Sequence, residues 1–242
     1  MNVIFVAWQE PLSRHWAPVG RLSKDNHEFK FVYTLGAKET PNFRPFGRMR
    51  DLYAEYKSEE LFPLFANRVL PKSRPEYRDY MHWLGLNEQN YDEMEELSRT
   101  AGLRATDSIE LFPCPTETKD KSYEVFFFSR GLRHMHKENQ ARAKMLSFGE
   151  QLYLMQDLQN KYVAMSLLLR TGDPVSLAGY APKYFSAEVT KLLQSNGQEN
   201  VKVTVEQVNP DAPLQYRVLC KLKTHWPVNF MPCSNDQFQS LA

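Results

Sequence analysis

The stretch 123–195 constrains the fold of this chain most, because several strand signals precede a single helix signal in it. Residues 123–128, 165–170 and 175–180 read as strands, and residues 151–155 alternate apolar and polar side chains. Residues 186–197 begin with Ser186 and end with Gly197, which is typical of a helix. Two further strand patterns follow at 201–208 and 216–222. The order predicts a small β-barrel with a basic, aromatic surface.

The residues before this stretch predict a separate β and helical domain. Residues 3–8 and 29–33 read as strands, and Asp25 and Asn26 form a turn signal between them. Helical patterns follow at 58–70, 75–84 and 91–100, and residues 105–112 return to strand. A proline-containing segment at 113–122 predicts the boundary. We therefore expect an α+β protein with domains at 1–115 and 122–242.

Composition excludes some classes of function. The formal net charge is +1, which excludes a uniformly basic surface but permits a local basic patch. The three cysteines lie far apart without a CxxC pair, so neither a zinc ribbon nor a disulfide framework is expected. No segment approaches the ~20 apolar residues of a membrane span. We expect a cytoplasmic protein that uses no cofactor and does not bind a membrane.

The candidate binding residues are cations, tyrosines and one asparagine. The basic residues could pair with phosphates or form a solvated face, and the tyrosines could stack on bases or pack in the core. Asn160 could bind a sugar or base, or form a turn. The basic cluster consists of Arg130, Arg133, Lys137, Arg142 and Lys144 with His134 and His136, and the tyrosines are Tyr153, Tyr162, Tyr180 and Tyr184.

Catalytic and metal-binding patterns are weaker. His134 and His136 could bind a metal from one face of a strand, but no third ligand has a supporting spacing. The acidic run at 92–96 reads as the outer face of a helix rather than as a pair of catalytic carboxylates. The sequence has no glycine-rich phosphate loop, nucleophile elbow or HExxH motif. We therefore expect a binding protein without enzymatic activity and without a metal site.

Three motifs in the second half resemble those of the HIRAN domain. They are Gly131-Leu-Arg-His, the segment 149–162, and Gly179-Tyr-Ala-Pro-Lys-Tyr-Phe followed by Leu192 and Leu193. The resemblance covers residues 122–197 and implies an OB-like barrel that binds DNA at a single strand or an end. It implies that the nucleic-acid-binding residues are Arg130, Arg133, His134, Lys137, Asn160, Tyr162, Tyr180 and Lys183. His134, Met135 and Val163 replace two tyrosines and an aspartate that help DNA-binding members of the family to hold a 3′ end.

Residues 1–75 resemble the N-terminal subdomain of HipA-type toxin kinases. The resemblance depends on Val19-Gly-Arg-Leu-Ser, Phe29-Lys-Phe-Val-Tyr and the segment 61–71. It implies a scaffold or interaction subdomain. Two functions therefore stay open: a bacterial DNA-binding accessory protein, and a protein-interaction or regulatory module of a toxin–antitoxin or defence system. The second would bind a partner encoded by a neighbouring gene.

Overall fold

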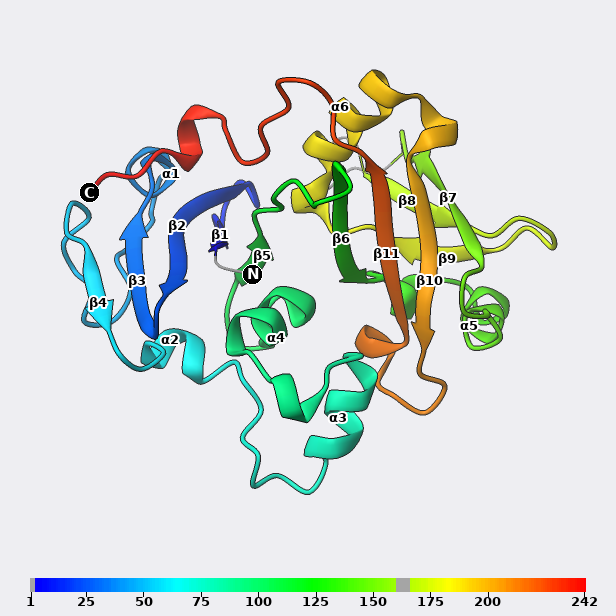
Figure 1. The fold of residues 1–242 in the computed structure, drawn as a ribbon, viewed down its shortest axis with the longest axis horizontal. Coiled ribbons are helices and arrows are strands. Elements are labelled where there is room, and N and C mark those ends of the chain that lie inside the picture. Colours follow the sequence, from blue (N-terminus) through cyan, green and yellow to red (C-terminus); the bar gives the residue numbers. More distant parts are fainter. Residues whose placement is uncertain (1–2, 160–165) are drawn as a thin grey trace. The chain divides into compact units, whose positions relative to one another are not determined.

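The computed structural model describes residues 3–159 and 166–242, and within them the chain is a mixed α+β protein. Its strands form one five-stranded and one six-stranded sheet (Figure 1). The chain divides into two compact units. The first comprises Met1–Tyr77, Glu88–Cys114 and Met231–Ala242, and the second comprises Arg78–Asn87 and Pro115–Phe230. Each unit contains one sheet, and the predicted α+β class is confirmed.

The sheet of the first unit has the order β4-β3-β2-β1-β5 and is antiparallel throughout. Asp25 pairs with Glu28 across Asn26 and His27, whose φ angles are 44° and 81°. Two left-handed residues in a two-residue loop are the hairpin geometry that matches the twist of the strands. The predicted turn is therefore confirmed. The strands are β1 (Val3–Gln9), β2 (Trp16–Asp25), β3 (Glu28–Tyr33), β4 (Tyr56–Ser58) and β5 (Ile109–Pro113).

The helices of the first unit are shorter than the sequence predicts. The patterns at 58–70 and 91–100 correspond to α2 (Pro63–Ala66) and α4 (Glu93–Thr100), and α1 (Leu35–Glu39) forms where no helix was predicted. Asp92 begins α4, where its carboxylate accepts a hydrogen bond from Met94 N at 3.1 Å. The helix predicted over 58–70 is too long: only Pro63–Ala66 is helical, and Ser58 belongs to β4, which pairs with β3.

The sheet of the second unit is antiparallel and has the order β6-β11-β10-β7-β8-β9. It curls so that its inner face encloses a core (Figure 1). All six strands and the closing helix predicted from the sequence are present, although Met165 lies outside the described residues. The elements are β6 (Ser122–Phe128), α5 (Lys137–Ala143), β7 (Gln151–Gln156), β8 (Leu167–Arg170), β9 (Leu177–Tyr180), α6 (Ser186–Asn196), β10 (Lys202–Val208) and β11 (Val218–His225).

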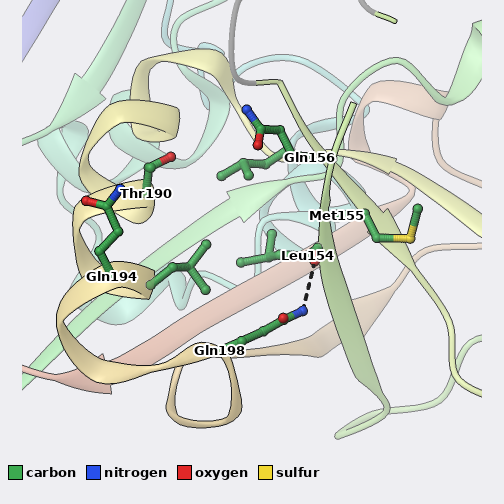
Figure 2. A pocket seen from close by; sticks show the side chains of 8 residues that line it. Leu154, Met155, Gln156, Thr190, Gln194 and Gln198 are labelled. Atoms are coloured by element: carbon green, nitrogen blue, oxygen red, sulfur yellow. Dashed lines mark hydrogen bonds between the residues drawn. The ribbon is translucent and has the colours of Figure 1, made fainter. Parts of the chain in front are cut away.

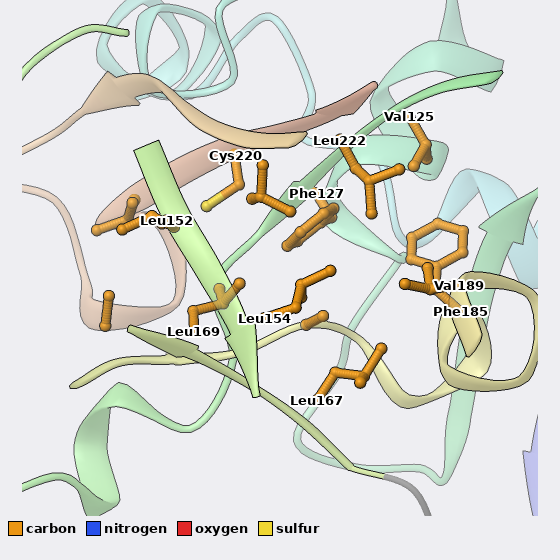
Figure 3. Packing of buried hydrophobic residues seen from close by; sticks show 14 of the residues in the cluster. Val125, Phe127, Leu152, Leu154, Leu167, Leu169, Phe185, Val189, Cys220 and Leu222 are labelled. Carbon is orange, nitrogen blue, oxygen red and sulfur yellow. The ribbon is translucent and has the colours of Figure 1, made fainter. Parts of the chain in front are cut away.

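Apolar side chains from every strand of this sheet and from α6 form one core. Phe127, Leu152 and Leu169 are buried between the strands, and Val189 of α6 and Phe185 pack against them (Figure 3). Full burial of such a side chain contributes about 1.5–3 kcal/mol. The alternation predicted for 201–208 is confirmed, since Val203 and Val205 are buried and Lys202 is exposed.

The compact units differ from the predicted domains at two segments. Met231–Ala242 belongs to the first unit, where Leu241 N donates to Tyr33 O at 3.0 Å. Arg78–Asn87 belongs to the second unit, where Gln207 Nε2 donates to the carbonyl of His82 at 2.6 Å. This segment contains most of α3 (Tyr77–Trp83). Among the described residues, no helix combines the length and apolarity needed to cross a membrane.

Candidate nucleic-acid interface

The candidate interface lies where the two edge strands of the six-stranded sheet meet. β6 and β9 are the outermost strands, and Arg130 and Tyr180 form an isolated antiparallel bridge just beyond β6. Arg130 N donates to Tyr180 O at 2.8 Å, and Tyr180 N donates to Arg130 O at 2.9 Å. The buried Ser129 hydroxyl donates to Ala178 O. We call these residues, 129–131 and 178–180, the seam.

Two glycines allow the backbone segments to approach at the seam. Gly179 has a φ of 98°, and a Cβ at this position would lie 2.1 Å from Ser129 Oγ and 2.6 Å from Arg130 O. Gly131 has a φ of 72°, and its Cβ would lie 3.1 Å from a ring carbon of Tyr180. Glycine is the residue that tolerates both a positive φ and such close approach. The close approach of the two backbone segments therefore explains why both motifs contain a glycine, Gly131 in one and Gly179 in the other.

Tyr180 is held in place at the seam. Its side chain is half-buried, and its hydroxyl donates to Asp157 Oδ2 at 2.8 Å. Asp157 Oδ1 accepts from Gln159 N at 3.1 Å, which orders the turn after β7. Asp157 thus connects the end of β7 to β9. The sequence did not identify Asp157 as a site residue, although Asp157 lies within the HIRAN-like motif at 149–162.

The predicted binding residues occupy several parts of this region. Arg130 is half-buried at the seam, and Lys183 is half-buried three residues beyond Tyr180. Arg133 and His134 are exposed in the turn after Gly131, where Arg133 Nε donates to His134 Nε2 at 2.9 Å. Lys137 is exposed at the start of α5. Asn160 and Tyr162 lie outside the described residues.

Some residues of the predicted basic cluster form ion pairs, and others do not. Arg142 pairs with Glu150, and His136 lies 3.7 Å from a Glu138 oxygen. Among the described residues, no carboxylate lies within ion-pair distance of Arg133 or Lys137, so both cations are available to a ligand. The predicted histidine pair has no third ligand either, since no metal-binding group of three His, Cys, Asp or Glu side chains occurs in the described part of the chain.

Two hollows elsewhere in the second unit suit phosphate less well. A pocket of about 510 Å³ beside β7 and α6 has only uncharged lining residues, and Gln198 Nε2 donates to Leu154 O there at 3.4 Å (Figure 2). A groove of about 910 Å³ crosses β10 and β11, but two of its lysines are paired: Lys221 with Glu124 at 3.1 Å and Lys223 with Asp120 at 2.7 Å.

Residues 122–226 match the family model of the HIRAN domain. This match supports a HIRAN domain at those residues. The matched segment begins with the first residue of β6 and ends one residue after β11, so it contains the whole six-stranded sheet. Searches of curated proteins and of solved structures gave no significant match to the chain.

The HIRAN match covers less than half of the chain. It supports the predicted HIRAN domain, with an end at residue 226 where the sequence resemblance ended at 197, and it suggests nucleic-acid binding for the second unit. The HipA-like resemblance of residues 1–75 stays a prediction, together with the toxin–antitoxin context and the neighbouring protein partner that it implied.

Proposed function

We infer that the HIRAN region is an OB-like barrel that binds single-stranded DNA or a DNA end without catalysing a reaction. The observation that carries this proposal is the HIRAN match over a sheet whose edge strands meet at Arg130 and Tyr180. The exposed Arg133 follows one side of this seam, and Lys183 follows the other. A DNA backbone lying across the seam would contact both cations.

The chemistry of these side chains favours binding a flexible strand through its phosphates. Cations supply phosphate contacts, and tyrosine rings supply stacking surfaces that tolerate any base. The hydroxyl of Tyr180 donates to Asp157, so its ring is held before a ligand arrives. A preorganised side chain loses less conformational entropy on binding. We therefore propose that affinity depends on phosphates and stacking, with little readout of sequence.

The two cations that flank the seam provide the direct test. The double change Arg133→Ala and Lys183→Ala should weaken single-strand binding about tenfold or more at low salt, because each change removes a charge-assisted interaction with a phosphate. The slope of the salt dependence should fall by about 0.7 for each phosphate that is no longer neutralised. Fluorescence anisotropy with a labelled oligonucleotide, from about 50 to about 200 mM salt, measures both quantities.

Lys191→Ala is the matched control, because Lys191 is an exposed cation on α6. It should leave affinity and slope unchanged. Duplex DNA with a blunt end and a sealed hairpin distinguish a preference for ends from a preference for single strands. The proposal fails if the unmodified protein binds none of these at low salt.

A further inference from the structure

The outer face of β7, β8 and β9 presents a second group of side chains beside the seam. Leu152, Leu154, Leu167 and Leu169 point into the core of the unit (Figure 3). The alternating residues of the same strands lie outside this core. Tyr153 and Met155 are 38% and 41% exposed on this outer face.

Register aligns these side chains in two rows across the sheet. Met155 pairs with Leu168, and Leu168 pairs with Tyr180, which belongs to the seam. The neighbouring row pairs Tyr153 with Arg170 and Arg170 with Leu177. Because paired residues of an antiparallel sheet share a face, Tyr153 and Arg170 lie on the same surface as Tyr180.

Tyr153 and Arg170 form a stacked pair. The guanidinium carbon of Arg170 lies 5.0 Å from the centroid of the Tyr153 ring, within the range of cation–π contacts. Arg170 Nη1 donates to Thr171 O at 3.1 Å, which fixes the guanidinium. Gly172 is next to the ring, and a Cβ there would lie 3.6 Å from Tyr153 Cε2. The neighbour at that edge of the ring is thus a residue without a side chain.

We propose that Tyr153 and Arg170 form a stacking platform for a further nucleobase of a strand bound at the seam. The inference rests on the proposed function and extends it along the sheet. Among the described residues, no carboxylate pairs with Arg170, so its charge is available to a phosphate. A planar guanidinium over an aromatic ring offers both a flat surface for a base and donors for a phosphate.

Strand geometry sets the length of nucleic acid that reaches the platform. Tyr153 and Tyr180 are separated by two strand spacings and one two-residue step, which places their Cα atoms roughly 12 Å apart. At a stacked base rise of about 3.4 Å this distance takes three to four steps, so a bound strand needs four to five nucleotides and a trimer, with only two steps, is too short. The charge of Arg170 and the continuity with the seam favour a nucleic acid over a protein as the occupant of this face.

The test compares a trimer with an oligonucleotide of about ten nucleotides, which spans both groups of residues. Tyr153→Ala should weaken binding of the longer oligothymidylate about 5- to 150-fold, the range measured for loss of one stacked base. Tyr153→Phe should retain binding within about twofold, because the ring is kept. Binding of the trimer should change little in either variant. Anisotropy measures the longer strand, and competition measures the trimer.

Tyr53→Ala is the matched control, because Tyr53 is another exposed tyrosine beneath a cation, with Lys38 Nζ 5.9 Å from its centroid in the first unit. It should bind both oligonucleotides normally. If the unmodified protein binds the longer strand and Tyr153→Ala binds it equally well, the platform is wrong and the seam proposal stands. If the unmodified protein binds neither, both proposals fail. If Tyr153→Ala abolishes self-association in sedimentation velocity without affecting DNA affinity, the face is a protein contact and the platform is wrong.

Discussion

At the scale of single residues, the seam depends on the absence of side chains as much as on their presence. Gly179 lies where any Cβ would overlap Ser129 Oγ and Arg130 O. The sequence motif identified Gly179 and Tyr180 as landmarks. The motif could not show why a glycine is needed at position 179, because the atoms that exclude a Cβ there belong to a segment about fifty residues earlier in the chain. Asn160 and Tyr162 were predicted at the same site and lie outside the described residues.

Replacement of Gly179 by alanine should therefore destabilise the second unit strongly. The overlap and the positive φ together should cost at least about 2 kcal/mol of unfolding free energy. Gly149→Ala is the control, because Gly149 has a φ of 77° but nothing within 4 Å of its Cβ position. That change should cost only about 1 kcal/mol. Urea unfolding measures both, and equal losses would contradict the steric explanation.

At the scale of elements, the sequence predicted strands better than short helices. Alternation at 201–208 predicted β10 correctly because one face of that strand is buried. Of the helix predicted at 58–70 only Pro63–Ala66 forms, and Ser58, its predicted first residue, pairs with β3 instead. Helical periodicity in a short segment does not show whether a strand that is distant in the sequence will pair with that segment. For the same reason, the pairing of Tyr153 with Arg170 needed the register of β7 and β8, which only the structure supplies.

The turn that leads into β6 contains an acid-sensitive contact. Asp120 accepts hydrogen bonds from Lys223 Nζ at 2.7 Å, from Thr118 Oγ1 and from Ser122 Oγ at 3.0 Å. The bond from Lys223, followed by those from Thr118 and Ser122, holds the pKa of Asp120 well below its usual value of 3.8. A carboxyl with a lowered pKa contributes stability above its unfolded pKa, and the contribution is lost as pH falls towards the folded pKa.

Asp120→Asn should therefore lower the urea midpoint at neutral pH, and the difference from the unmodified protein should narrow as pH falls below about 4. Asp211→Asn serves as the control, because Asp211 is exposed and no hydrogen bond joins it to another described side chain. It should leave the pH profile of stability unchanged. A difference for Asp120→Asn that is constant from pH 7 to about 3 would contradict the ionic explanation.

At the scale of the whole chain, the compact units are not continuous in sequence. Met231–Ala242 follows the HIRAN region but packs in the first unit, where Leu35 N donates to Gln239 O at 2.8 Å. The rings of Phe5 and Phe238 lie 4.7 Å apart in an edge-to-face arrangement. A boundary placed from composition could not detect this return of the chain, because the tail is irregular and carries no strong periodic pattern.

Removal of residues 231–242 should therefore destabilise the first unit while DNA affinity changes by less than about twofold. The deletion removes the Leu241 bond to Tyr33 and the packing of Phe238 against Phe5. Hydrogen exchange should quicken in β1 and β3, since local stability follows local packing. Phe238→Ala should produce a smaller effect of the same kind. Loss of protection in β6 and β11 as well would show that the units unfold together.

The seam also has a thermodynamic consequence. Arg130, just beyond β6, and Tyr180 of β9 are joined by two backbone hydrogen bonds, and the Ser129 hydroxyl adds a third bond between the two edges of the sheet. On the proposed function, a strand of DNA would contact both edges of the sheet at this bridge. DNA binding and the bridge would then be thermodynamically linked: the free energy by which bound DNA stabilises the bridge equals the free energy by which the bridge increases the affinity for DNA. The stability of the contact between the two edges of the sheet would then depend on whether DNA is bound.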